Sequence, residues 1–264
     1  MNRILFEKGE IAEGVAEFGG ERAAHVLEVL HGEVGQTLKT GEVDGRIGTS
    51  EIVEITRGAG DQGPAIRVRV CHDQESLRPW VDVILAPPRP RVMKRLLPQL
   101  AAMGVGRIVL VGAKKVEKDF WGATLLKEEN YRPLLIDGLM QAGTSILPVL
   151  EVRRGFRRFV ADELDAMFPT TRRIVAHPYG RDGTTGTDET SGTGLSHGSH
   201  SSRAFLLAVG PEGGWTDDEV ELLESKGFRR YSLGPRILRT DTAVIALLAR
   251  LGTEYDNKTK EETW

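Results

Sequence analysis

After residue 80, short apolar runs alternate with segments of helical periodicity, and this alternation constrains the fold more than any other feature of the chain. Continuous apolar runs at 81–86, 107–112 and 204–210 predict strands that are covered on both faces. Further strands are predicted at 149–152, 173–177 and 229–233, and helices at 90–103, 125–142, 155–168, 216–226 and 240–251. Strands that alternate with helices predict an α/β domain with a parallel sheet and helices on both faces.

The first 73 residues have a different pattern. Residues 36–42, 46–56 and 65–71 alternate apolar and polar side chains and are separated by glycine-containing turns. Residues 21–31 are the exception, with Ala24, Leu27 and Leu30 at helical spacing. We therefore expect a small β-barrel domain over 1–73, a linker over 73–79 and the α/β domain over 80–253.

Composition narrows the class of protein. The net charge of −3 lowers the expectation of nucleic-acid binding without excluding a basic face. Cys71 is the single cysteine, so neither an intrachain disulfide nor a thiolate metal cluster is expected, and no metal site is predicted. No apolar run approaches the roughly 20 residues of a membrane span, and the N-terminus lacks the pattern of a signal peptide. We expect a cytoplasmic protein without a membrane partner.

Residues 179–203 are rich in Gly, Ser, Thr and His and carry no apolar period, so we expect a flexible insertion there. Gly194, Ser196 and Gly198 match the nucleophile elbow of hydrolases, but that motif requires a sharp turn between a strand and a helix. His197 and His200 lie in the same stretch without an acidic or thiol partner. We interpret both signals as coincidental.

The segment from Leu206 to Glu219 predicts a ligand-binding loop. A buried strand ends at Gly210-Pro211-Glu212-Gly213-Gly214, where glycines permit positive φ and close approach of a ligand to the backbone. Thr216 and Glu219 then have the spacing of a capping box.

A second Gly-Pro turn follows another predicted strand, in the segment Leu233-Gly-Pro-Arg-Ile-Leu-Arg-Thr-Asp-Thr242. Arg236 and Arg239 precede a helix that Thr240 or Asp241 caps. Open sheets bind ligands at the carboxyl ends of their strands, so the two turns predict a shared crevice.

These two segments, about twenty residues apart, resemble the end of the 16S ribosomal RNA uridine-N3 methyltransferase family, which belongs to the knotted SPOUT class. The order of a barrel-like domain and an α/β domain is similar as well. The resemblance implies a PUA-like, RNA-binding β-barrel, a trefoil-knotted methyltransferase domain, a homodimer, S-adenosyl-L-methionine as cofactor, and 16S ribosomal RNA in the 30S subunit as partner. The cofactor residues that it implies are Leu207, Gly210, Pro211, Glu212, Gly214, Leu233, Gly234, Ile237 and Leu238.

The uridine N3 must lose its proton before it attacks the sulfonium methyl, so the site must stabilise a developing anion. Arg236 and Arg239 are the catalytic candidates, because guanidinium groups stay charged and offer several donors. Asp241 is a candidate base, although a capping role is favoured. The basic cluster Arg89, Arg91, Lys94 and Arg95 is the candidate RNA-binding surface, and the group Arg153, Arg154, Arg157 and Arg158 is favoured as a solvated face.

The chain departs from the family pattern at four positions. Met140 and Thr144 replace charged residues of the central helix, and Glu28 and His31 stand where the family tends to have arginines. Two alternatives therefore stay open: methylation of another RNA position, and a catalytically silent RNA-binding dimer. A phosphate-ligand enzyme that uses the Thr216 helix N-terminus is disfavoured by Glu212, Asp217 and Asp218.

Overall fold

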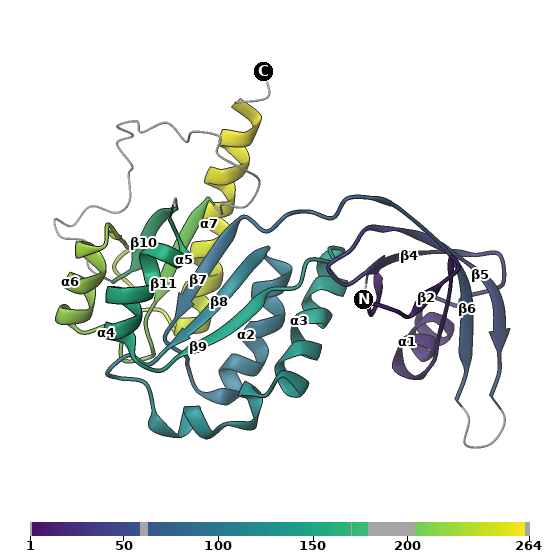
Figure 1. Cartoon of the computed structure of the whole chain (residues 1–264), viewed down its shortest axis with the longest axis horizontal. Helices are drawn as coiled ribbons and strands as arrows, with labels where there is room; N and C mark the ends of the chain where they lie inside the picture. The colour runs from purple at the N-terminus through teal and green to yellow at the C-terminus, as the bar shows by residue number, and fades with distance from the viewer. Residues whose placement is uncertain (1, 59–62, 170, 179–203, 262–264) are drawn as a thin grey trace. The chain divides into compact units, whose positions relative to one another are not determined.

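A computed structural model describes residues 2–58, 63–169, 171–178 and 204–261, with the backbone alone for 257–261 (Figure 1). The chain divides into two compact units. Unit 1 comprises Met1–Arg78 and Pro133–Leu147, and unit 2 comprises Pro79–Arg132 and Pro148–Trp264. The expected insertion at 179–203 lies outside the described residues.

Unit 1 contains a six-stranded sheet of mixed direction in the order β1-β4-β5-β6-β3-β2. Strands β4 (Thr37–Glu42), β5 (Ile47–Thr56) and β6 (Ala65–Gln74) were predicted from their alternation of apolar and polar residues. Three shorter strands were not predicted individually: β1 (Ile4–Phe6), β2 (Ile11–Ala12) and β3 (Val15–Phe18). They have two to four residues each, too few to establish a period. Strand β1 pairs in parallel with β4, and the other pairs are antiparallel.

The helix predicted at 21–31 is shorter and less regular than expected. Helix α1 (Gly20–Ala24) continues as a single π-helical segment (His25–Val29). It ends before His31, whose φ of +51° is incompatible with a right-handed helix. Glu28 and His31, two of the departures from the family pattern, are exposed.

Residues 133–147 also pack within unit 1. The carbonyl oxygen of Met140 accepts hydrogen bonds from the backbone N–H groups of Asn2 and Arg3, each 3.1 Å long. The hydroxyl of Thr144, which is buried, lies 2.9 Å from the hydroxyl of Ser76. Because Thr144 is hydrogen-bonded away from solvent in this chain, a charged residue there would be desolvated.

Unit 2 contains six parallel strands in the order β12-β10-β11-β7-β8-β9. Their bounds are β7 Val81–Leu85, β8 Val105–Val111, β9 Val149–Arg153, β10 Arg172–Ala176, β11 Phe205–Val209 and β12 Arg229–Tyr231. Strands β7 and β11, at the centre, are buried at every residue, as apolar runs covered on both faces require. The prediction of an α/β fold with a parallel sheet is confirmed.

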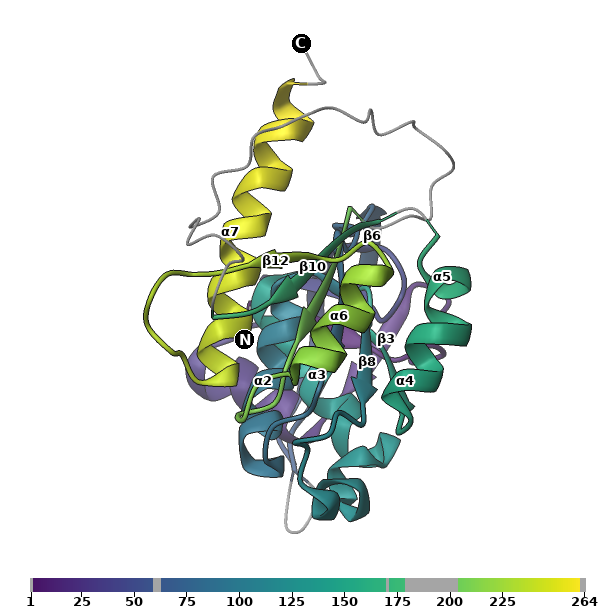
Figure 2. The same ribbon diagram turned by 90° about the vertical axis from the view of Figure 1, so that its left-hand side faces the viewer.

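Helices cover both faces of this sheet (Figure 2). Helices α2 (Pro90–Ala102) and α7 (Thr240–Glu261) lie together on one side. The other side carries α4 (Phe156–Arg158), α5 (Leu164–Met167) and α6 (Asp217–Ser225), and a π-helical segment (Phe159–Glu163) joins α4 to α5. Two 3-10 turns (Lys118–Gly122 and Thr124–Leu126) lead into α3 (Glu128–Ala142).

Helix α7 is ten residues longer than predicted. The apolar period stops at Leu251, but tertiary contacts hold the next turns. Glu254 pairs with Arg172 at 3.1 Å, and the ring of Tyr255 stacks on Trp80 with centroids 5.6 Å apart. The apolar side chains Val244, Leu247, Leu248 and Leu251 are buried within the single chain. None of the described helices is long and apolar enough to cross a membrane.

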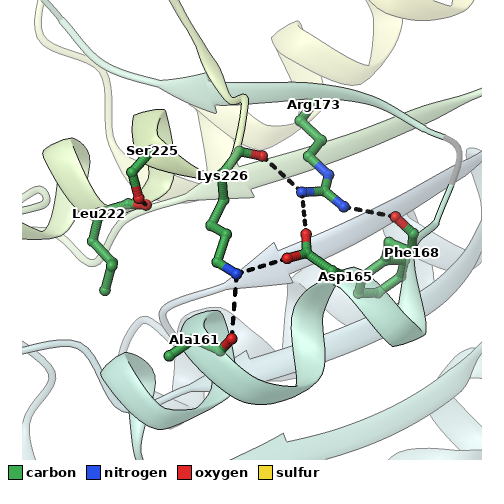
Figure 3. Close-up of polar contacts among 7 residues, drawn as sticks. All are labelled: Ala161, Asp165, Phe168, Arg173, Leu222, Ser225 and Lys226. Atoms are coloured by element: carbon green, nitrogen blue, oxygen red, sulfur yellow. Dashed lines mark hydrogen bonds and ion pairs between the residues drawn. The ribbon is translucent and has the colours of Figure 1, made fainter.

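A polar network joins the helices of one face to the sheet (Figure 3). Arg173, on β10, donates to the Asp165 carboxylate at 2.7 Å and to the carbonyl oxygens of Phe168 and Lys226 at 2.8 and 2.7 Å. The ammonium of Lys226 donates to the other Asp165 oxygen at 2.6 Å. These two hydrogen bonds lower the pKa of Asp165, the one from Lys226 contributing most. The network therefore ties α5 and the end of α6 to the start of β10.

Candidate active site

A pocket of about 510 Å³ lies within unit 2, over the carboxyl ends of three neighbouring strands. Three of its walls are loops or helix starts that follow β7, β8 and β11, and the fourth is the start of α7. The lining residues are Arg89, Val92, Arg95, Lys115, Glu117, Glu212, Gly213, Arg239, Thr240 and Asp241. The position agrees with the rule that open parallel sheets bind ligands beyond the carboxyl ends of their strands.

The loop after β11 has a conformation that requires glycine. Gly214 has a φ of +69°, and a Cβ at Gly210 would lie 3.0 Å from the backbone nitrogen of Trp215. The N–H of Gly214 donates to the carbonyl of Pro211 at 2.8 Å, which closes a tight turn. This turn places Glu212 and Gly213 at the pocket.

Glu219 connects this loop to its neighbour. The predicted capping box of α6 is present, and one Glu219 carboxylate oxygen accepts the backbone N–H of Thr216 at 2.9 Å. The other oxygen accepts the backbone N–H of Lys114 at 2.7 Å. Glu219 is 5% exposed, so both bonds form out of solvent. One buried carboxylate therefore fixes the loop after β11 and the loop after β8 to each other.

The pocket contains four cationic side chains and three acidic ones. Arg89 Nε lies 3.0 Å from a carboxylate oxygen of Glu117, and Arg95 Nη2 lies 3.5 Å from one of Asp241. Lys115 Nζ donates to the carbonyl oxygen of Gly213 at 2.7 Å. Four cationic side chains thus line a single pocket in a chain whose net charge is negative.

Of the two catalytic candidates, only Arg239 lies at the pocket. Arg239 lines the pocket, one residue before α7 begins. Arg236 is exposed on the connection between β12 and α7 and is not among the lining residues. Asp241 Oδ1 accepts the backbone N–H of Thr242 at 2.9 Å, so its carboxylate participates in the first turn of the helix as well as in the pair with Arg95.

The residues expected to bind the cofactor occupy two segments, and of them only Glu212 lines the pocket. Leu207 is buried in the middle of β11, Gly210 and Pro211 are buried directly after that strand, and Gly214 is half-buried. On the connection after β12, Leu233, Ile237 and Leu238 are 37%, 79% and 38% exposed, and Gly234 has a φ of +111°. Large apolar side chains are thus exposed in a six-residue stretch beside the pocket-lining Arg239.

The residues of the two predicted basic clusters lie in different environments. Arg89 and Arg95 line the pocket, whereas Arg91 and Lys94 are exposed on α2 outside it. Three of the four arginines at 153–158 are engaged in structural contacts, and Arg158 is exposed. Arg153 pairs with Glu163 and Glu151 at 2.7 and 2.6 Å, and these carboxylates, Glu163 first, raise the pKa of its guanidinium. Arg154 stacks over Trp121, and Arg157 pairs with Asp218 at 3.1 Å.

Five lining residues were not singled out from the sequence as site residues: Val92, Lys115, Glu117, Gly213 and Thr240. Lys115 and Glu117 follow β8 and belong to no sequence motif that would have marked them as site residues. The signal that identifies them is topological, because β8 lies beside β7 and its carboxyl end faces the same crevice.

Comparison with known proteins agrees with this architecture. Residues 75–252 match the family model described as an RNA methyltransferase domain. A ribosomal RNA small subunit methyltransferase E of Treponema pallidum is 30% identical over 253 residues, which cover 94% of this chain and 90% of that protein. A protein of Borreliella burgdorferi with the name ribosomal RNA small subunit methyltransferase E 1 is 24% identical over 93% of this chain and 95% of its own length.

Two solved structures share the fold. The ribosomal RNA small subunit methyltransferase E of Neisseria gonorrhoeae, bound to S-adenosyl methionine, has a TM-score of 0.67 at 22% identity and covers 96% of this chain and 97% of that one. A methyltransferase of Legionella pneumophila, also in complex with S-adenosyl methionine, has a TM-score of 0.67 at 24% identity with the same coverage. The parallel sheet, together with the match of residues 75–252 to the RNA methyltransferase domain model, defines the chain as an RNA methyltransferase. It belongs to the ribosomal RNA small subunit methyltransferase E family, and the resemblance drawn from the two Gly-Pro segments is confirmed.

Proposed function

We propose that the protein transfers the methyl group of S-adenosylmethionine to N3 of a uridine in 16S ribosomal RNA of the 30S subunit. The observation that carries this proposal is the pocket at the carboxyl ends of β7, β8 and β11, lined by four cationic and three acidic side chains, in a chain whose relatives are named ribosomal RNA methyltransferases. A ribosomal substrate also implies action in the cytoplasm.

The residues beside the pocket fit the cofactor. Leu233, Ile237 and Leu238 expose apolar side chains that suit the faces of an adenine ring, and the space beside Gly234 is open where a Cβ would stand. In our proposal these residues hold the cofactor together with Leu207, Gly210, Pro211, Glu212 and Gly214. The bound cofactor supplies a methyl group on a positively charged sulfur.

The chain's own residues would act on the acceptor. In the reaction N3 would lose its proton to solvent water, and the resulting anion would take the methyl group from the sulfonium sulfur, which would be left as a neutral thioether. Negative charge therefore develops on the uracil before methyl transfer, and Arg239 lies in the pocket where it can stabilise that charge. Arg236 lies outside the pocket, so we assign the electrostatic role to Arg239 alone.

The family resemblance also supports a PUA-like fold for unit 1, an RNA-binding role for that unit, a trefoil knot in unit 2 and a homodimer. The burial of the apolar face of α7 within one chain does not itself require a dimer. Sedimentation equilibrium of the purified protein tests the homodimer directly, and a monomeric mass at micromolar concentration would contradict it.

The function is tested with labelled S-adenosylmethionine, purified 30S subunits and bulk transfer RNA, followed by nucleoside analysis. We expect label in 3-methyluridine from the 30S subunits. Arg239→Gln should lower kcat by about 100-fold, in line with the loss of one donor to a developing anion, while Arg236→Gln should retain most of the activity. Label at another nucleoside would overturn the acceptor position. Absence of label with any RNA, despite calorimetric binding of the cofactor, would favour the silent RNA-binding protein.

A further inference from the structure

Three of the four cations that line the pocket are already engaged by oxygen atoms of the chain itself. Glu117 holds Arg89, Asp241 holds Arg95, and the carbonyl of Gly213 holds Lys115. A carboxylate on an arginine occupies the position that a phosphate oxygen would take, because both anions accept bidentate hydrogen bonds from a guanidinium. An RNA that enters this pocket must therefore compete with the protein's own carboxylates.

Of the two acid–arginine pairs, Arg89 and Glu117 are the more easily separated. Their side chains are 70% and 58% exposed, and an exposed ion pair corresponds to at most about a fivefold change in an equilibrium. The carboxylate of Glu117 accepts no second hydrogen bond within the described part of the chain. Asp241, by contrast, is 26% exposed and also accepts the N–H of Thr242. Glu117 can leave its arginine without cost to a helix.

The backbone of Arg89 is held more firmly than its side chain. The residue lies in the sequence Pro87-Pro88-Arg89-Pro90, where the prolines restrict φ on both sides. Its backbone N–H donates to Glu212 at 3.2 Å, which fixes it to the loop after β11. The base of this side chain is therefore fixed at the rim of the pocket, and the guanidinium alone is left to change partners.

We propose that Arg89 and Glu117 form an exchangeable pair, in which an RNA phosphodiester replaces the Glu117 carboxylate on the Arg89 guanidinium. Arg89 is then a phosphate-binding residue of the acceptor site. Glu117 is a positioning residue that keeps Arg89 at the pocket in the free protein and weakens the binding of RNA by competition. The inference rests on the proposed function, since it requires an RNA acceptor at this pocket.

The test measures equilibrium binding of purified 30S subunits between about 50 and 200 mM salt. The proteins are wild type, Arg89→Gln, Glu117→Gln, the double variant and Asp119→Asn. Asp119 is the matched control, because it is exposed in the same segment and its substitution removes the same charge outside the lining of the pocket.

We expect Glu117→Gln to tighten Kd by about two- to fivefold, the range of an exposed ion pair. Arg89→Gln should weaken binding and reduce the slope of log Kd against log salt by about 0.7 to 1, the value of one phosphate contact. The double variant should bind like Arg89→Gln alone, because Glu117 acts through Arg89. A merely structural role of Glu117 would not produce this dependence on Arg89.

Three results would overturn the proposal: no tightening in Glu117→Gln, equal tightening in the Arg89→Gln background, or equal tightening in Asp119→Asn. Methyl transfer by the wild type distinguishes these results from failure of the proposed function. If wild-type protein labels 3-methyluridine in 30S subunits while any of the three occurs, only the exchange is wrong. If wild-type protein neither binds nor labels 30S subunits, both proposals fail.

Discussion

Glu219 provides the sharpest test of how this site is built. Its buried carboxylate accepts one backbone N–H from the α6 cap at Thr216 and one from the loop after β8 at Lys114. Glu219→Ala removes both acceptors. Loss of the cap contribution costs about 1 kcal/mol, and the unpaired donor in the second loop costs about 1 to 3 kcal/mol. We expect the free energy of unfolding of unit 2 to fall by about 2 to 4 kcal/mol.

Glu219→Gln should cost about half as much, because the amide retains one acceptor oxygen while its NH2 group faces the other backbone donor. Urea denaturation followed by tryptophan fluorescence measures the effect in unit 2, since all four tryptophans (80, 121, 215 and 264) belong to that unit. Glu221→Ala is the control: the same residue type is removed from the same helix at an exposed position. A difference of less than about 0.5 kcal/mol between Glu219→Ala and Glu221→Ala would show that the carboxylate does not join the two loops.

Three further predictions test other parts of the structure. The pKa of Asp165 is lowered in the folded protein, so its stabilising contribution is present above the unfolded pKa and disappears as the pH falls through the folded pKa. Asp165→Asn should lower stability at pH 7 by about 1 kcal/mol or less, and the urea curves of both proteins should converge once the pH has fallen below the folded pKa of Asp165. Gly210→Ala places a Cβ 3.0 Å from a main-chain nitrogen and should cost about 1 to 3 kcal/mol in the same assay, with an unchanged midpoint arguing against the turn described. Thr144→Val leaves the hydroxyl of Ser76 without one buried partner and should destabilise unit 1 by about 1 kcal/mol, visible as faster amide exchange in that unit alone by mass spectrometry.

Much of the fold follows from patterns that are local in sequence. Largely apolar runs identified β7, β8 and β11, because strands covered on both faces are made mostly of apolar residues, although β7 includes the buried Asp82 and β8 includes Arg107. The spacing of Thr216 and Glu219 predicted a cap that the structure contains. The Gly-Pro turns identified the family, since a turn with positive φ and close backbone contacts restricts residue choice within a few positions.

What the sequence alone could not decide depends on contacts between distant residues. Lys115 and Glu117 belong to the pocket because strand order brings the end of β8 beside the ends of β7 and β11, and no local pattern encodes strand order. Arg236 and Arg239 are equivalent candidates in the sequence, but in the structure only Arg239 lines the pocket. The final turns of α7 exist because Glu254 and Tyr255 find distant partners, although their apolar period has ended. Local patterns specify elements and turns, whereas tertiary structure selects which side chains share a pocket, because that choice is made by packing across the whole sheet.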